Sequence, residues 1–238
     1  MLEIKISKEY QETVFDDFRL QISNNDITAI VGESGCGKST LLNCILNLEK
    51  FSGYIKLDGK IITKASQDFS IIFQDFTQLF PWLNVIDNII FPLRHSKLTK
   101  EVKMEKANKL LKIIGLESYG NYRINQLSGG MKQRVSLARA IISQPKFLLL
   151  DEAFSALDYE NKEQLLDLLL RLNKLYQTTI IFVTHDLDEA LTIADRIVKL
   201  ASNPAKIVKD IIVDKEKNME INSDYYKKLK AELKENLD

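Results

Sequence analysis

A glycine-rich loop constrains the fold more than any other part of this 238-residue chain. The ten residues VGESGCGKST, at 31–40, follow the apolar run ITAI and precede an expected helix, STLLNCILNL. Gly32, Gly37, Lys38 and Ser39 match the G-x-x-x-x-G-K-[ST] pattern, in which the backbone N–H groups of a flexible loop surround phosphate oxygens. Because the pattern stands between a strand and a helix, it predicts a phosphate-binding α/β core.

The loop predicts a nucleoside triphosphate as its ligand. Lys38 is expected to reach the β- and γ-phosphates, and the Ser39 hydroxyl to bind Mg²⁺. The start of the following helix adds positive dipole. A glycine-rich turn that matches by chance is the alternative, and the loop alone leaves kinases, GTPases, helicases and transport ATPases open. The remaining residues expected around the phosphates are Ser34, Gly35, Cys36 and Thr40.

The amino-acid composition limits which partners and which cellular compartment the chain can have. Lys plus Arg equals Asp plus Glu at 33 each, so the net charge gives no general attraction to nucleic acid. Two cysteines, Cys36 and Cys44, are too few for a disulfide framework and favour a reducing, cytosolic compartment. The opening MLEIKISKEY alternates like a strand, not a leader, and the apolar runs fall short of the roughly 18 residues of a membrane helix. At a membrane, we expect another protein to hold the chain.

The order of apolar patterns predicts the architecture. Short runs rich in Ile, Val and Phe fill most of the first 75 residues, and helical spacing follows from about 85 to 143. FLLLDE and TTIIFVTHD then read as buried strands, with the helical segment YENKEQLLDLLLRLNKLYQ between them and LDEALTIADRI after them. This alternation predicts a mainly parallel sheet covered by helices and interrupted by a helical segment.

Polar residues follow the two buried strands. Asp151 and Glu152 end FLLLDE, where Asp151 is expected to hold Mg²⁺ through its water shell and Glu152 to polarise the attacking water. His185 follows the next strand and is expected on the same edge of the sheet, in contact with the γ-phosphate. Solvated charges and a structural histidine are the alternatives.

The stretch LSGGMKQR, at 127–134, resembles the signature of the ATP-binding subunits of ABC transporters. Ser128, Gly129 and Gly130 are expected to form a second phosphate-binding site at a helix start, and a plain serine cap is the alternative. The resemblance implies a head-to-tail homodimer, in which each signature covers the ATP held by the other copy. It also implies a P-loop NTPase core with a mainly parallel sheet, an N-terminal antiparallel β-subdomain and an inserted helical subdomain at about 79–143. One domain then covers 1–238, with a surface helix at 215–238.

Further marks of the family occur in the expected order over residues 2–214. By resemblance, Gln74 touches Mg²⁺ and reports the nucleotide state to the membrane partner, and Asp158 in SALD lies in the loop that crosses the dimer interface. Tyr10, 22 positions before Gly32 (32 minus 10), is expected to stack on adenine, although Phe15 could serve. Two departures are Met131, where many members have Gln, and Ala153, where proline is usual.

A narrower resemblance concerns LFPWLNVIDNI, at 79–89, which is similar to importers for nitrate, sulfonates and taurine and for thiamine-pyrimidine precursors. Trp82 with Leu79 and Phe80 suits a groove for a short helix of a membrane protein, or Trp82 packs within the helical subdomain. The resemblance implies two permease copies, two copies of this chain and an extracytoplasmic solute-binding protein. The chain is then cytoplasmic and peripheral on the inner face of the membrane.

Two other classes of protein are alternatives. A soluble ABC-type ATPase acting on DNA or ribosomes is disfavoured, because DNA-repair members insert long coiled coils between loop and signature. Here Ser128 follows Gly37 by 91 positions (128 minus 37), without sustained heptads. Ribosome-associated members carry two such domains in one chain. A binding-only pseudo-ATPase is disfavoured because Lys38, Asp151, Glu152 and His185 are all present.

Overall fold

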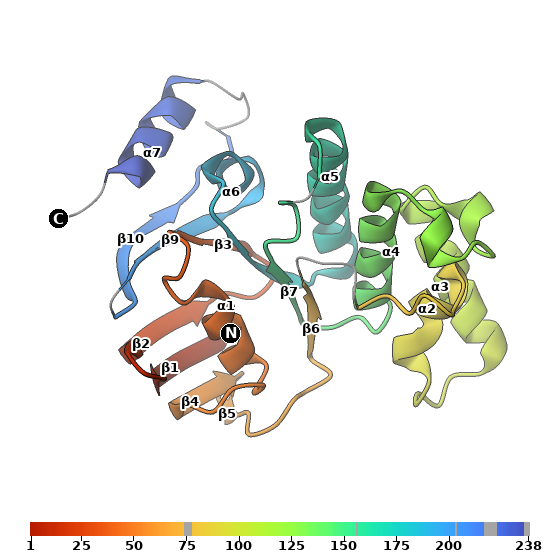
Figure 1. Ribbon diagram of the computed structural model, residues 1–238, viewed down its shortest axis with the longest axis horizontal. Helices are drawn as coiled ribbons and strands as arrows, with labels where there is room; N and C mark the ends of the chain where they lie inside the picture. The colour runs from red at the N-terminus through yellow and green to blue at the C-terminus, as the bar shows by residue number, and fades with distance from the viewer. Residues whose placement is uncertain (74–77, 156, 203, 217–222, 236–238) are drawn as a thin grey trace. The chain divides into compact units, whose positions relative to one another are not determined.

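The computed structural model describes residues 1–73, 78–155, 157–202, 204–216 and 223–235 (Figure 1). Gln74 lies outside these ranges, as does Ala156 of the SALD segment. The chain divides into two compact units, one formed by Met1–Ser66 with Thr179–Asp238 and the other by Gln67–Thr178. Each unit contains its own buried apolar side chains.

The first unit begins with an antiparallel sheet in the order β2-β1-β4-β5. Alternate residues of β1 point inward, so that Leu2, Ile4 and Ile6 are buried while their neighbours are partly exposed. This confirms the N-terminal antiparallel subdomain that the resemblance implied. The strands are β1 (Leu2–Glu9), β2 (Thr13–Ile22), β4 (Ser52–Leu57) and β5 (Lys60–Ile61).

A second sheet in the same unit carries the glycine-rich loop. Its strands lie in the order β10-β9-β3-β8, and β3 is parallel to both of its neighbours. The first five residues of β3 and all six of β8 are buried, as expected for central strands covered on both faces. The strands are β3 (Ile27–Gly32), β8 (Thr179–Thr184), β9 (Arg196–Ala201) and β10 (Lys206–Ile212), with helices α1 (Lys38–Ile45) and α6 (Leu187–Ile193).

The sequence pattern placed LDEALTIADRI in one helix, and the structure corrects its end. Helix α6 stops at Ile193, Ala194 is already extended with ψ 143°, and Arg196 begins β9. Over so short a run, the apolar residues of RIVKL fit both the period of a helix and the period of a strand. Pairing of β9 with β3, with Ala29 opposite Ile197, decides in favour of a strand.

The second unit is mainly helical. Strand β6 (Phe69–Ile72) lies parallel to β7 (Phe147–Asp151), with Ile72 opposite Leu150. Leucines at spacings of three and four bury one side of the helix that follows β7. The helices are α2 (Val85–Ile90), α3 (Lys100–Ile113), α4 (Gly129–Ile141) and α5 (Tyr159–Tyr176), with 3₁₀ turns at Phe91–Leu93, Glu117–Tyr119 and Ile124–Gln126.

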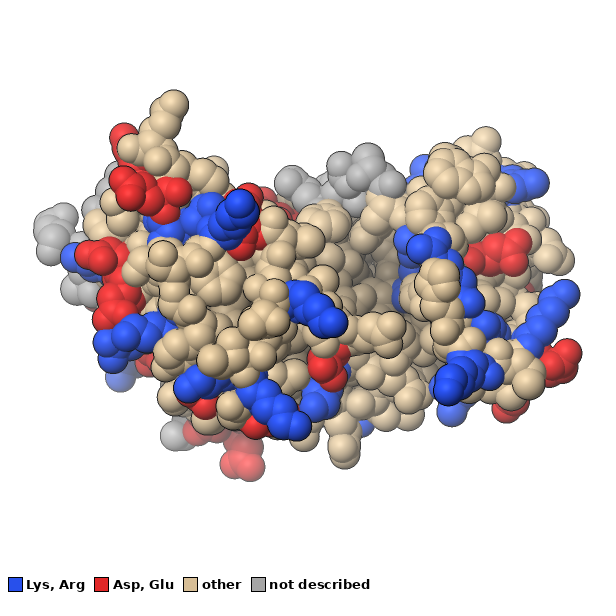
Figure 2. Space-filling model, turned by 90° about the horizontal axis from the view of Figure 1, so that it is seen from below, with Lys and Arg blue, Asp and Glu red and all other residues tan. Residues whose placement is uncertain are grey.

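The last described helix, α7 (Asp224–Lys234), belongs to the first unit. Its buried residues Tyr226, Leu229 and Leu233 recur every three or four positions, so one face packs and the other carries charges. Within the described ranges, no helix combines the length and the apolar character that crossing a membrane requires. On the face in Figure 2, Lys and Arg side chains lie among Asp and Glu side chains, and neither sign covers a large area.

Candidate active site

The glycine-rich loop connects the end of β3 to the start of α1, as its pattern predicted. A β-carbon on Gly32 would lie 2.7 Å from the carbonyl oxygen of Leu200 in β9 and 2.8 Å from Cys36 Sγ. Gly37 has φ 97°, and a β-carbon there would lie 2.9 Å from Val14 Cγ1. Close approach requires the first glycine, and the left-handed backbone requires the second.

Lys38 fills the centre of this loop. Its side chain is buried, and Nζ donates hydrogen bonds of 2.8 Å to the carbonyls of Gly32 and Glu33. Burial raises the pKa of the nearby Cys36 thiol, although the Lys38 charge lowers it, so the thiol is neutral at pH 7. The loop therefore presents a cation and backbone N–H groups without a compensating thiolate, as an anion site requires.

His185 lies beside this loop at the same edge of the sheet. It directly follows Thr184, which stands opposite Val31 in the parallel pairing of β8 and β3. Gly32, the next residue of β3, begins the loop. Within the first unit, His185 and the glycine-rich loop therefore share one edge of the sheet. The sequence-based expectation that Asp151 emerges at the same edge as His185 stays a prediction.

The two aromatic candidates for adenine stacking differ in exposure. Tyr10 is 54% exposed, and Lys8 Nζ lies 4.1 Å from the centre of its ring. Phe15 is fully buried, packs against Phe18 at 5.0 Å between ring centres, and lies under Gly37. Of the two rings, Tyr10 is the one that a base can reach.

In the second unit, the carboxylates occupy a fixed turn. Asp151 is the last residue of β7, and Glu152 follows in the left-handed region with φ 47°. The Glu152 carbonyl accepts hydrogen bonds from the Ser155 backbone N–H at 3.2 Å and from Ser155 Oγ at 2.9 Å. Ala153 is buried, and its carbonyl accepts a 2.7 Å bond from Gln133 Nε2 of α4. The turn is therefore held on both sides of Ala153.

The signature residues begin α4. Ser128 is its N-cap, with Oγ accepting from the Met131 N–H at 3.3 Å, and Gly129 and Gly130 form the first turn. The serine cap that stood as the alternative is therefore present. The same hydroxyl keeps its own proton for donation, so the cap leaves a contact with phosphate open.

Asn161 is a site residue that sequence reasoning missed. Its side chain packs against Gly130, and its Nδ2 donates a 2.7 Å bond to Oδ2 of Asp158, the N-cap of α5. Hydrogen bonds from Asn161 lower the pKa of the Asp158 carboxyl, which stays ionised at neutral pH. The signal in the sequence was the spacing D-x-x-N at a helix start, which predicts a cap but not its neighbour in α4.

The site residues thus fall into two groups. Lys38, His185 and Tyr10 belong to the first unit, and Asp151, Glu152 and the signature belong to the second. Among the described residues, no three His, Cys, Asp or Glu side chains gather as a metal site. The Ser39 hydroxyl and the Asp151 carboxylate are oxygen donors of the kind that Mg²⁺ prefers, and Mg²⁺ characteristically takes few protein ligands beside nucleotide phosphates.

Comparison with known proteins agrees with these features. A family model described as ABC transporter matches residues 15–155. The chain is 40% identical over 201 residues to the taurine import ATP-binding protein of Sinorhizobium fredii, covering 84% of this chain and 75% of that protein. It is 43% identical over 199 residues to the aliphatic sulfonates import ATP-binding protein of Bacillus cereus, covering 83% and 78%.

The chain is also similar to a polyamine import protein and to a solved ATP-binding cassette structure. The spermidine/putrescine import ATP-binding protein of Haemophilus influenzae is 40% identical over 210 residues, and the match covers 86% of this chain but 56% of that protein. Among solved structures, the dimeric structure of a post-hydrolysis state of an ATP-binding cassette bound to ADP and Pi superposes with a TM-score of 0.77. It is 29% identical and is covered to 99%, against 90% of this chain.

Proposed function

The chain belongs to the ABC transporter family of ATP-hydrolysing, ATP-binding subunits, and from this we propose that it is the motor that powers import of a small solute through a separate membrane permease. The single observation that carries the proposal is the buried Lys38 ammonium, held within a strand–loop–helix at the edge that His185 shares. The taurine, sulfonate and polyamine relatives are all named as ATP-binding proteins of import systems.

We propose that the whole chain, 1–238, forms one ABC ATP-binding domain. The helical subdomain is inserted at about 79–143, a placement that the run of helices α2 to α4 supports. The segment 215–238 ends the domain with a surface helix, in which α7 keeps one charged face.

ATP binding is assigned to the loop and to Tyr10. Lys38 exchanges its two carbonyl partners for oxygens of the β- and γ-phosphates, while backbone N–H groups of the loop surround the same phosphates. The remaining contacts come from Ser34, Gly35, Cys36, Gly37 and Thr40. Tyr10 stacks on adenine, which its exposure supports.

Mg²⁺ is assigned to Ser39, Asp151 and Gln74. The hydroxyl of Ser39 and the carboxylate of Asp151 have the donor chemistry that this ion requires, and Gln74 lies outside the described residues. Bound there, Mg²⁺ supplies charge neutralisation for the phosphates.

Hydrolysis is assigned to Glu152 and His185. The Glu152 carboxylate accepts a proton from a water molecule as its oxygen attacks the γ-phosphorus, and the bond from phosphorus to the β,γ-bridging oxygen breaks. His185 contacts the γ-phosphate and helps to orient Glu152 and the water. The fixed turn around Glu152, anchored by Ser155 and Gln133, supports a role that needs a set geometry.

We propose that two copies pack head to tail, with Ser128, Gly129 and Gly130 of each copy on the ATP of the other. The N-terminus of α4 offers backbone N–H groups and positive dipole to a phosphate. Asp158 lies in the loop assigned to the dimer interface. The dimeric form of the structural relative supports this arrangement.

The permease contact is assigned to Trp82. This side chain is 67% exposed, and its ring stacks on Phe80 with 5.1 Å between centres. Arg139 in turn lies over Phe80, with its guanidinium carbon 4.3 Å from the centre of the Phe80 ring. An exposed indole on a rigid aromatic base suits a groove that receives a short helix from the permease.

For the solute, we propose a small anion such as nitrate, a sulfonate or taurine, which the taurine and sulfonate relatives favour. A thiamine-pyrimidine precursor carried by the same mechanism is the second candidate. The solute binds an extracytoplasmic binding protein and the permease, and the permease holds this chain at the inner face of the membrane. Binding assays on that partner protein decide between the candidates.

Glu152→Gln tests the motor. We expect ATP turnover to fall by about 10²- to 10⁴-fold, because the amide cannot accept the proton. We also expect the variant to remain an ATP-bound dimer in gel filtration, because hydrolysis no longer separates the copies. Glu160→Gln, an exposed acid in the first turn of α5, is the matched control and keeps turnover unchanged. A Glu152→Gln protein that stays monomeric with ATP while the wild type dimerises contradicts the assignment.

A further inference from the structure

The turn that carries His185 is held from both sides by one hydroxyl group. Thr184 Oγ1 accepts a 3.0 Å bond from the Asp186 N–H and donates a 2.6 Å bond to Glu189 Oε2. Thr184 ends β8 and Glu189 lies on α6, and both side chains are buried. The strand end and the helix are therefore linked across His185.

Asp186 fixes the start of α6 directly after the histidine. Its Oδ1 accepts bonds from the backbone N–H groups of Asp188, at 2.8 Å, and Glu189, at 3.4 Å. A side-chain cap of this kind binds the first-turn N–H groups of the helix while the cap residue itself stays extended, as Asp186 does with ψ 110°. The orientation of α6 and the backbone around His185 are thus coupled.

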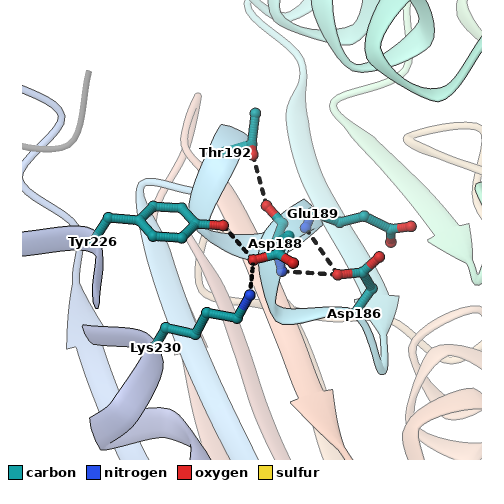
Figure 3. A network of polar contacts seen from close by, with 6 residues as sticks. All are labelled: Asp186, Asp188, Glu189, Thr192, Tyr226 and Lys230. Carbon is teal, nitrogen blue, oxygen red and sulfur yellow. Dashed lines mark hydrogen bonds and ion pairs between the residues drawn. The ribbon is translucent and has the colours of Figure 1, made fainter. Parts of the chain in front are cut away.

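Helix α7 holds α6 at its exposed side. The Tyr226 hydroxyl and Lys230 Nζ both donate to Oδ1 of Asp188, one turn apart on α7 (Figure 3). Tyr226 is buried and Lys230 is partly exposed, so the tyrosine ring anchors the contact and the lysine adds charge. These contacts join residues 38 and 42 positions apart in the chain.

Helix α7 is itself firmly attached to the unit. Leu229 and Leu233 bury its apolar face. Its last carbonyls accept bonds from two lysines of the sheet, Lys209 to the Glu232 carbonyl at 2.5 Å and Lys199 to the Glu235 carbonyl at 2.9 Å. Cations at this end also complement the helix dipole. The helix can therefore serve as a fixed support for α6.

We propose that Tyr226 and Lys230 are positioning residues for ATP hydrolysis, which fix Asp188 and through α6 hold the His185 turn in its working geometry. They touch neither nucleotide nor reacting water. The proposal rests on the proposed function in that His185 acts on the γ-phosphate. It gives the C-terminal helix a role in the rate of the motor.

The test combines kinetics with a spectroscopic signal from His185. The chain has two histidines, His95 and His185, so the imidazole Cε1–H signals in the NMR spectrum are assigned with His95→Gln alone. In Tyr226→Phe/Lys230→Met, we expect the His185 signal to move while the His95 signal stays. We expect kcat for ATP to fall about tenfold with KM unchanged, since a misplacement of about 1 Å can lower a rate by about 10²-fold.

Two variants serve as controls. Tyr225→Phe removes the hydroxyl of the adjacent tyrosine, which accepts from the Asp214 N–H at 3.1 Å and not from α6, and keeps both kcat and the His185 signal. Lys230→Arg retains the charge and keeps most of the rate. Should the double variant fail to fold, Tyr226→Phe, which keeps the buried ring, is measured in its place.

An unmoved His185 signal overturns the proposal whatever happens to kcat, and so does a moved signal with unchanged kcat. A loss of kcat with equal changes in Tyr225→Phe also overturns it, because the helix would then act through stability alone. A wild-type protein without ATPase activity contradicts the proposed function, whereas the NMR signal still decides whether α7 holds the His185 turn.

Discussion

Gly130 packs so closely against Asn161 that a β-carbon on Gly130 would lie 2.5 Å from Asn161 Oδ1. The same amide donates from Nδ2 to Asp158. The first turn of α4 and the cap of α5 are thus joined through one side chain. Two segments assigned to the dimer interface share a single support.

Gly130→Ala tests this support. Because the contact is with the end of a side chain, we expect Asn161 to move and release Asp158, while the free energy of unfolding changes by no more than about 1 kcal/mol. ATP-dependent dimerisation, measured by gel filtration in the Glu152→Gln background, should weaken. Adding Asn161→Ala removes the clash and should leave the dimer no weaker than Asn161→Ala alone. A Gly130→Ala protein that dimerises as tightly as its parent contradicts the prediction.

Tyr10→Ala should weaken nucleotide binding. Stacking of a base on an aromatic ring contributes about 1–3 kcal/mol, so Kd for ADP should rise by about 5- to 150-fold in calorimetric titration. Tyr10→Trp should retain affinity. The matched control is Tyr54→Ala, since Tyr54 also carries a lysine over its ring, with Lys56 Nζ at 4.2 Å, and is not assigned to the base. Equal losses in the two alanine variants would argue against stacking at Tyr10.

Ala153→Pro restores the residue that is usual in the family. We expect kcat for ATP to change by less than about threefold, because the Ser155 and Gln133 contacts already fix the turn, and proline stabilises mainly by restricting the unfolded chain. In a Gln133→Met background, where the Ala153 carbonyl loses its donor, the same proline should matter more. A large change of kcat in the single variant, in either direction, would contradict this view.

The Asp188 contact should depend on pH. Burial raises the pKa of this carboxyl, but the hydrogen bonds from Lys230 and Tyr226 and the charges of Lys230 and Lys234 together outweigh that effect, so the net pKa lies below the usual 3.8. A carboxyl with a lowered folded-state pKa stabilises the protein above its unfolded pKa, and that stabilisation is lost as the pH falls through the folded pKa. The Tm difference between wild type and Asp188→Asn should therefore be full near neutral pH and shrink below about pH 4. A difference that grows with acidification would refute the sign.

The positions of the candidate site residues in the fold could be predicted from the sequence because each motif is local. The strand before the loop from Gly32 to Ser39 and the helix after it are adjacent to it in the sequence. Asp151 and His185 each follow a run of buried residues. The boundary between α6 and β9 was not readable, because RIVKL fits a helix or a strand until it pairs with β3. Asn161 was missed because its neighbour Gly130 lies 31 positions away (161 minus 130) on another helix.

The sequence by itself determined the phosphate loop, the signature, the carboxylates and the family, since these depend on residue types at fixed short spacings. Tertiary structure alone decided that Phe15 is buried and Tyr10 exposed, and that Tyr226 and Lys230 reach Asp188. Such relationships join residues far apart in the chain, and they arise from which faces of strands and helices are buried together. A sequence pattern predicts which face of a helix or strand is buried, but it does not predict which other face that one packs against.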